Sequence, residues 1–490
     1  MKTVCKNIHF IFLLIGTLLF LLPAVAQTSN TGYFMTSHHN RTSLNPALRP
    51  ENGYIGVPGL SNICVDYKTN SLNLETFMFP GGPAGSLKNS VTFLHEGITT
   101  EQFMSNIFNN NYANFDVDWT FAGAGFYKDD GFWFVDLGIR AYANFNAPYD
   151  LFNFAKQGLT DSNGELVEGY DMKNIRGTAT CYFELGVGHS RSFLDDKLVV
   201  GLKAKALFGL ANGNLRVNKL DLNTGIDKWT VDANAAFEGT LPGFVPDYDE
   251  DGLFNGFKKE GHSGISGFGL GFDLGATYKL SCLADALNNE IFNRFTFSAA
   301  FTDIGFIGWS SKRTMYLATK KQEKPVTIAG DFIISTNGEG ESLGDQIEVI
   351  FDKLKDAVNL EETGKNSGRT TGLRTKMNWG LEYEIIENQL SAGILSTTYF
   401  TPVSNVTEFT LAGAYKPVNW FEAGLSYSFV YGNFKTFGLA LNFVPSKGVN
   451  VFLASDYLIP RWNSDFIPTT SKAVNFQVGL TIPLESKKTS

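Results

Sequence analysis

Residues Gly267 to Leu280 read GFGLGFDLGATYKL and alternate strictly between two kinds of side chain. One set is apolar (Phe268, Leu270, Phe272, Leu274, Ala276, Tyr278 and Leu280), whereas the intervening positions are glycine, hydroxyl-bearing or charged. Successive side chains of a β-strand point to opposite faces, and about 9–11 tilted residues suffice for a strand to cross a membrane. The stretch therefore predicts a spanning strand with one face toward lipid and the other toward a barrel lumen.

The same alternation continues along the chain and predicts an all-β fold, a transmembrane antiparallel β-barrel of about 14 strands. The expected strands are residues 62–67, 114–127, 131–145, 180–191, 197–210, 267–280, 294–303, 371–386, 389–400, 406–416, 420–431, 435–444, 449–457 and 473–482. Long connections alternate with short ones, as expected when both termini are periplasmic and the long loops lie outside. Two further pairs, 215–222 with 229–237 and 313–319 with 325–334, also alternate; they either protrude into the outer space or raise the total to about 16–18.

The N-terminus has the pattern of a secretory signal peptide. Lys2 and Lys6 precede an apolar run over residues 8–22, and Ala24-Val25-Ala26 matches the small-residue cleavage pattern. An uncleaved anchor is the alternative, but no cluster of charges follows the run. We expect a mature chain that begins at Gln27 and lies in the bacterial outer membrane. The expected division is a signal peptide (1–26), an N-terminal hatch segment (27–59), the barrel (60–483) and a C-terminal tail (484–490).

Composition agrees with a barrel and argues against other classes. Gly and Phe are frequent, at 50 and 43 of 490 residues, yet the mean hydropathy of −0.07 is close to neutral. Alternating strands produce this combination because their polar face offsets their apolar face. The net charge of −9 argues against nucleic acid as a partner. The three cysteines of the mature chain, Cys64, Cys181 and Cys282, are far apart and odd in number, which argues against a disulfide framework.

One acidic motif resembles part of a calcium site. Asp247, Asp249 and Asp251 form the first half of a calcium-binding loop, D-x-D-x-D-G. Lys258 occupies the position at which a bidentate glutamate is required, so an acidic, solvated outer loop is the competing interpretation. The motif is therefore a weak candidate for metal binding, and the sequence predicts no cofactor.

Histidines offer two further candidates for chemistry. His189 precedes Ser190, but adjacent residues of a strand point to opposite faces, so this histidine cannot activate that serine. His38 and His39 could bind a metal, yet no carboxylate or cysteine accompanies them in the sequence. We therefore expect a protein that is not an enzyme.

Charged residues on the predicted inner face carry both signs. The candidates for the lumen are Asp136, Arg140, Glu184, Lys203, Lys205 and Asp273, together with Asp116, Asp118, Lys279, Glu382 and Glu384. A selective pore more often presents one sign of charge at its constriction. The mixture instead predicts salt bridges that anchor a hatch or a loop. Short amphipathic helices are expected at residues 100–108 and 341–362, in long outer loops.

Several motifs carry a resemblance to a known group of proteins. They are Leu44-Asn45-Pro46-Ala47 with residues 54–60 (YIGVPGL), Gly267-Phe268-Gly269 with residues 273–278 (DLGATY), and residues 303–307 (DIGFI) with Trp309. In these the chain resembles a family of uncharacterised outer-membrane barrels from Bacteroidota. That family is more distantly similar to FadL-type fatty-acid transporters and to the PorV and PorQ barrels of type IX secretion.

The resemblance implies a fourteen-stranded barrel whose N-terminal segment, residues 32–58, folds into the lumen as a hatch. A disordered periplasmic leader is the alternative. Asn45 and Pro46 are placed to make a rigid bend in this segment. We expect a plugged channel or transporter for a small, hydrophobic solute, with membrane lipid as its surroundings. The alternative is a non-transporting scaffold for secretion or surface proteins.

Overall fold

The computed structural model describes most of the chain from residue 29 to residue 486. Its gaps are residue 80, 82–87, 96, 159–164, 166, 226–227, 249, 251–253, 261–263, 321–324, 330–357, 359, 364–366, 404, 431–432, 446–447 and 459–470. Within the described residues, no helix is both long enough and apolar enough to span a membrane.

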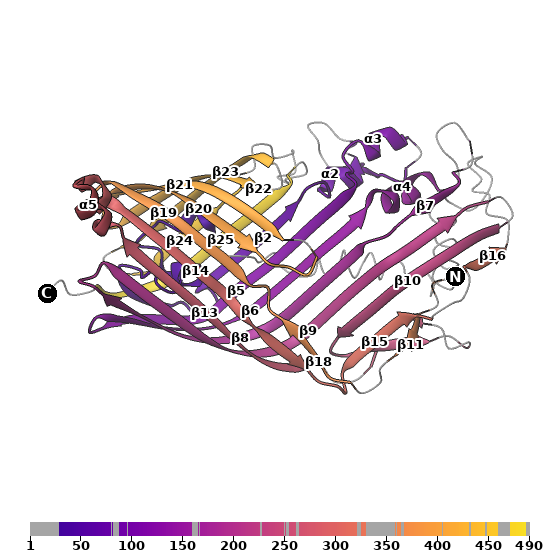
Figure 1. The fold of residues 1–490 in the computed structure, drawn as a ribbon, viewed down its shortest axis with the longest axis horizontal. Helices are drawn as coiled ribbons and strands as arrows, with labels where there is room; N and C mark the ends of the chain where they lie inside the picture. The colour runs from indigo at the N-terminus through magenta and orange to yellow at the C-terminus, as the bar shows by residue number, and fades with distance from the viewer. Residues whose placement is uncertain are drawn as a thin grey trace.

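Fourteen antiparallel strands close into one barrel (Figure 1). The wall strands are β2 (Asn62–Thr69), β5 (Asn110–Lys128), β6 (Gly131–Pro148), β8 (Ile175–Phe193), β9 (Leu198–Asn223), β13 (Gly267–Lys279), β14 (Phe295–Trp309), β19 (Lys376–Ile386), β20 (Leu390–Tyr399), β21 (Val406–Val418), β22 (Phe421–Val430), β23 (Asn433–Phe443), β24 (Asn450–Ser455) and β25 (Ala473–Ser486). Each pairs with the next along the chain, and β2 pairs with both β5 and β25 to close the wall. The prediction of a fourteen-stranded barrel is confirmed.

Strand β13 shows how the alternation produces two faces. Phe268 and Leu274 are 65% and 50% exposed on the outer surface, whereas Asp273 between them is 1% exposed in the lumen. Its neighbours β9 and β14 pair along its whole length, so the same division extends across the sheet. The outer surface of the barrel is consequently a band of exposed apolar side chains around a polar interior.

Two of the wall positions are broken into two pieces. Strand β1 (Asn52–Gly56) pairs with β25 and β5 just as β2 does, and residues 57–61 separate β1 from β2. Strand β18 (Arg369–Gly372) likewise precedes β19, with residues 373–375 between them, where one strand over 371–386 is predicted. The second break coincides with Arg374, which is buried and bonded to Asp116 across the lumen.

The sheet continues beyond the barrel at one end. Strand β9 has 26 residues, and its far half pairs with β7 (Gly169–Asp171) and β10 (Lys228–Thr240). Strand β10 also pairs with β15 (Thr314–Thr319) and β16 (Val326–Ala329), and β15 pairs with β17 (Leu360–Glu362). The two additional strand pairs of the sequence therefore extend the wall and do not add spanning strands.

This extension and the nearby helices have cores of their own. Phe154, Met172, Leu222 and Trp229 belong to one buried cluster, and Phe103 and Met104 belong to another. The helices are α2 (Leu74–Phe77), α3 (Thr100–Met104) and α4 (Tyr149–Gln157), and the small hairpins are β3 (Met78–Phe79) with β4 (Val91–Thr92) and β11 (Phe244–Tyr248) with β12 (Phe254–Lys259). Together they form an outer lobe, opposite the end that carries α5 (Ser281–Leu287) and the C-terminus (Figure 1).

The prediction of a helix over residues 341–362 is wrong at its C-terminal end. Residues 360–362 form strand β17, because they continue the sheet edge beside β15. The remainder of that prediction falls almost entirely outside the described residues. Helix α3 starts at Thr100, where Thr99 and Gln102 cap it reciprocally, but it ends at Met104, four residues before the predicted end at residue 108.

Leu274→Arg tests the assignment of faces. A cation on the apolar outer face should cost roughly 2–4 kcal/mol of barrel stability if the site lies near the membrane midplane. Thr277→Arg, on the opposite face of β13, should cost less because its side chain reaches the lumen mouth. Urea unfolding of the folded barrel in detergent or vesicles measures both. Equal destabilisation by the two variants would show that the faces are assigned wrongly.

Candidate functional site

Residues 29–51, here called the N-terminal segment, lie against the inner wall of the barrel. The segment contains two short turns of 3-10 helix, η1 (Asn30–Gly32) and η2 (His39–Ser43), and most of its residues are buried. Its contacts reach strands on opposite sides of the lumen, from β8 and β13 to β22 and β24. The segment therefore occupies the lumen.

Two carboxylates of the wall bind the backbone of this segment. Asp456, just after β24, accepts hydrogen bonds from the N–H groups of Asn30 and Thr31 at 2.9 and 2.8 Å. Glu422 of β22 accepts from the N–H groups of Thr36 and Ser37 at 2.9 and 2.8 Å. Bonds from N–H groups to ionised acceptors are among the stronger hydrogen bonds in proteins. These two carboxylates fix the course of the first ten residues.

The Asn45-Pro46 bend touches the opposite wall. The Asn45 side chain accepts from the N–H of Ala47 at 2.9 Å, and it donates to the carbonyl of Ala299 at 3.3 Å. The wall residues next to the bend are glycines. A Cβ added at Gly275 would lie 2.0 Å from Asn45 Oδ1. A Cβ added at Gly201 would lie 2.3 Å from the Pro46 carbonyl. The inward glycines of the alternating strands leave the space that this bend fills.

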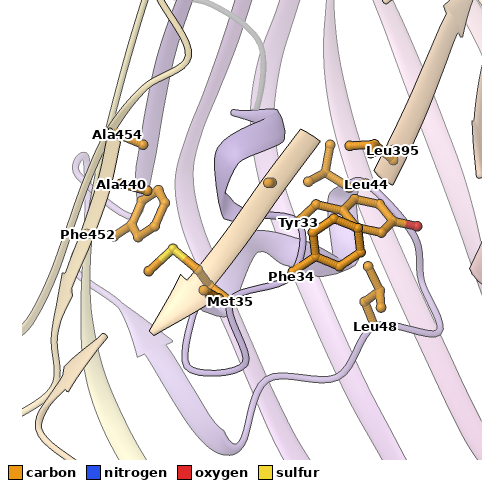
Figure 2. Close-up of a cluster of buried hydrophobic side chains, with 11 residues drawn as sticks. Tyr33, Phe34, Met35, Leu44, Leu48, Leu395, Ala440, Phe452 and Ala454 are labelled. Atoms are coloured by element: carbon orange, nitrogen blue, oxygen red, sulfur yellow. The ribbon is translucent and has the colours of Figure 1, made fainter. Parts of the chain in front are cut away.

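On the side of β20 to β24 the contact is apolar (Figure 2). Tyr33, Phe34 and Met35 pack with Leu44 and Leu48 of the same segment, and they face a wall formed by Leu395, Ala412, Ala414, Ala440, Phe452 and Ala454. The small wall residues make the lumen wide enough for the three large side chains.

On the side of β5 to β19 the lumen is charged. Lys203 bonds Asp136 and Glu184 at 2.9 and 2.8 Å, and Lys205 bonds Asp273 at 2.7 Å. Further ion pairs join Arg140 to Asp118 at 2.8 Å, Lys205 to Asp303 at 2.6 Å, Lys376 to Asp303 at 3.5 Å, and Arg374 to Asp116. The structure thus brings Asp136, Arg140, Glu184, Lys203, Lys205 and Asp273 into one cluster. Opposite charges offset one another there, so the cluster is no single-sign constriction.

The space left in this cluster is small. A cavity of about 40 Å³ lies between the charged groups and residues Ser43 and Leu44 of the N-terminal segment. A water molecule needs roughly 10–15 Å³ measured in this way, so the cavity has room for a few waters and not for an organic solute. This side of the lumen is closed in the structure.

A second charged group lies between β2, β20, β21 and β24. Lys68 bonds Asp66 at 2.7 Å and Glu408 at 3.1 Å, and Glu408 also accepts from the Tyr457 hydroxyl at 2.8 Å. The Lys68 ammonium sits 5.3 Å from the centre of the Tyr399 ring. Neither Lys68 nor Glu408 was among the lumen charges predicted from the sequence, because no local pattern links residues so far apart along the chain.

Other predicted site residues lie apart from the lumen cluster. Lys279 is exposed at the end of β13, and Glu382 and Glu384 belong to β19 without entering the ion pairs above. Asp247 lies in the exposed hairpin β11–β12, with Lys258 Nζ 3.5 Å away. Asp249 and Asp251 lie outside the described residues. Among the described residues there is no group of three metal-binding side chains.

The three histidines singled out in the sequence pack against aromatic rings and backbone groups. His38 stacks on Phe452, with ring centres 3.7 Å apart, and His39 contacts the carbonyl of Ser61 at 3.0 Å. Burial lowers the pKa of His39 to about 4, so the ring is neutral. Ser190 faces the lumen and accepts from Arg49 at 3.0 Å, whereas His189 packs against Trp133 with the ring centres 4.1 Å apart. The histidine and serine thus lie on opposite faces of β8.

Residues 46–456 match the model of a family of unknown function, DUF5723. The chain belongs to that family. No curated protein matches the chain.

Solved structures of membrane channels show a remote similarity to this family member. One is the Ralstonia pickettii toluene transporter TbuX, with 8% identity, a TM-score of 0.37 and an alignment that covers 94% of each chain. Another is the Pseudomonas putida toluene transporter TodX, with 11% identity, a TM-score of 0.33 and an alignment that covers 94% of this chain and 93% of that chain. A Pseudomonas aeruginosa FadL homologue is also similar, with 11% identity, a TM-score of 0.38 and an alignment that covers 94% of this chain and 100% of that chain. At such identities and scores the likeness carries no conclusion about solute or mechanism.

Lys203→Met tests the importance of the lumen ion pairs. Removing Lys203 leaves Asp136 and Glu184 with longer ion pairs, such as those to Arg140 at 3.9 and 3.6 Å, so their buried charges lose their nearest partner. This loss should cost about 3 kcal/mol of stability, the lower end of the range for a broken buried pair. Lys219→Met is the matched control, because Lys219 pairs with Asp232 at a site where its side chain is 45% exposed. The control should cost at most about 1 kcal/mol. Denaturant titration measures both, and equal costs would contradict a desolvated cluster.

Gly275→Val tests the packing of the bend against the wall. The added side chain must displace Asn45, which should make it easier for the N-terminal segment to detach locally from the wall. A decrease of roughly 1.4 kcal/mol in the free energy of this local opening should make trypsin cleave after Arg41 and Arg49 about tenfold faster. Gly308→Val is the control, since a Cβ there meets only the Phe268 carbonyl at 3.6 Å. Peptide mapping of assembled barrels reads the result. Unchanged cleavage in Gly275→Val would contradict this packing.

Proposed function

We propose that this protein is an outer-membrane channel whose lumen is closed by its own N-terminal segment and which passes a small apolar solute. The band of exposed apolar residues supports the membrane placement, because a closed barrel with polar groups inside is one of the two structures that satisfy every backbone group in lipid. The outer membrane is the bacterial membrane of such barrels.

The observation that carries the proposal is the apolar contact in the lumen. Tyr33, Phe34 and Met35 fill a space bounded by Leu395, Phe452 and small apolar residues. If the segment leaves, it uncovers an apolar, glycine-containing part of the wall where Tyr33, Phe34 and Met35 had packed, and an apolar solute can replace these side chains there. The polar wall groups that hold the segment, such as Glu422 and Asp456, are uncovered beside it. The charged cluster on the other wall stays satisfied by its own ion pairs, because its acids and bases all belong to the barrel.

The segment is held in a manner compatible with release. Its main polar anchors are hydrogen bonds from backbone N–H groups to Asp456 and Glu422, and water can replace such partners when the lumen is wet. No disulfide ties the segment to the wall, because the cysteines among the described residues are free. Movement therefore requires the exchange of hydrogen bonds, of apolar contacts and of the ion pair between Glu51 and Lys416 of β21.

Deletion of residues 29–51 tests the proposal. The deletion spares β1, which is part of the wall, so the barrel should still assemble and keep its heat-dependent gel mobility. Uptake of a fluorescent apolar tracer into reconstituted vesicles should rise well above that of the intact protein. Asp456→Ala with Glu422→Ala, which keeps the full chain and removes both anchors, should raise it in the same direction.

Two controls sharpen this measurement. Lys219→Met changes an exposed ion pair far from the segment and should leave uptake unchanged. An anionic tracer of similar size should enter less readily than the apolar one, because the uncovered wall offers an apolar patch beside the carboxylates of Glu422 and Asp456. Unchanged uptake by a correctly assembled deletion would contradict the proposal and favour the scaffold alternative.

One observation favours that alternative, a non-transporting scaffold. The outer lobe has its own buried core, with Phe154, Leu222 and Trp229 at its centre, and it includes strands that no spanning barrel needs. A folded lobe of this kind could hold a secretion or surface protein. The scaffold role predicts normal partner binding after the deletion of residues 29–51, together with a lumen that stays impermeable.

A further inference from the structure

The outer surface of the barrel has a depression over strands β19 to β22. A row of paired residues crosses it: Phe295 and Tyr383 on one side, Ala392 and Gly413 in the middle, and Leu425 beyond them. The two middle residues are the smallest in the row, and they form the floor of an open groove of about 540 Å³. Large side chains on both sides of two small ones therefore produce the hollow.

A second row closes the groove on the side toward the outer lobe. Ile394 and Leu411 pair next to the floor, and Tyr427 and Phe437 continue the row. Leu411 and Phe437 are 51% and 47% exposed, so they stand above the surface as a rim. The lining is apolar almost throughout, and it is continuous with the exposed apolar band of the barrel.

A cation lies just outside the lining of the groove, next to Phe295 in the chain. Arg294, the last residue of η4 (Glu290–Arg294), precedes Phe295 of the groove lining. Its Nη1 donates to the carbonyl of Ile385 at 3.1 Å, which places the guanidinium beside the end of β19. Within the described part of the chain it forms no ion pair. This end of the barrel carries α5 and the C-terminus (Figure 1).

We infer that the groove binds one phospholipid, with an acyl chain over Ala392 and Gly413 and the phosphate on Arg294. The inference rests on the proposed membrane placement, which puts the end near the C-terminus at the periplasmic leaflet. An apolar slot with an exposed arginine near one end fits an amphiphile with an anionic head, because the guanidinium donors that do not bond Ile385 can bind phosphate. A protein partner would require polar groups along the rim, as interfaces normally have, and this rim is apolar.

Native mass spectrometry tests the inference with the assembled full-length barrel. The protein is reconstituted into vesicles of phosphatidylethanolamine and phosphatidylglycerol, extracted in mild detergent and weighed intact. The expected result is one retained phospholipid per barrel. Gly413→Phe, which fills the floor, and Arg294→Gln, which removes the cation, should each lower the retained fraction about tenfold.

Gly308→Phe is the matched control. Gly308 pairs with the exposed Phe268 on the outer face, away from the groove, and a Cβ there meets only a backbone oxygen at 3.6 Å. This variant should keep the lipid. Equal loss from Gly308→Phe and Gly413→Phe, or a retained protein in place of the lipid, would overturn the inference.

The experiment separates this inference from the proposed function. All variants are first checked for heat-dependent gel mobility, which reports an assembled barrel. A wild-type chain that fails to assemble in vesicles would contradict the membrane placement itself. An assembled wild-type barrel that retains no phospholipid would contradict the lipid site alone.

Discussion

The interior of the barrel must be filled, and this requirement shapes much of the rest of the structure. About eight strands enclose a space that wall side chains can fill, whereas larger barrels contain either water or a plug. Here fourteen strands surround a segment of the same chain, and wall glycines such as Gly201 and Gly275 make room for it. The glycine-rich inner face is therefore a packing feature.

The two halves of the lumen satisfy this requirement by different means. Between β20 and β24, apolar side chains of the N-terminal segment pack on a wall of small residues. Between β5 and β19, acids and bases of the wall neutralise one another, and Arg374, at the break between β18 and β19, pairs with Asp116 of β5. The charged half pairs residues of the wall with one another, whereas the other half is filled by a segment whose backbone is bound by Glu422 and Asp456. Under the proposed function, this second half is the one that exchanges its contents.

The sequence was sufficient for the spanning strands and their faces because alternation is local. It also identified the inward charges of the cluster, such as Glu184 and Lys203, and the bend at Asn45-Pro46. It could not identify Asp456 or Glu422 as anchors, because their partners lie 426 and 386 positions away along the chain. Nor could it place the break at Arg374, which depends on a contact across the barrel and not on any turn signal.

The central claim is that backbone groups of the N-terminal segment are bound to the wall in the closed lumen. Hydrogen exchange at single residues of the assembled barrel tests it most directly. The account predicts slow exchange at the amides of Asn30, Thr31, Thr36 and Ser37, which donate to Asp456 and Glu422. It also predicts that Asp456→Ala with Glu422→Ala accelerates exchange at these four amides while the amides of β13 stay protected. Rapid exchange at the four amides of the unaltered protein would contradict the account.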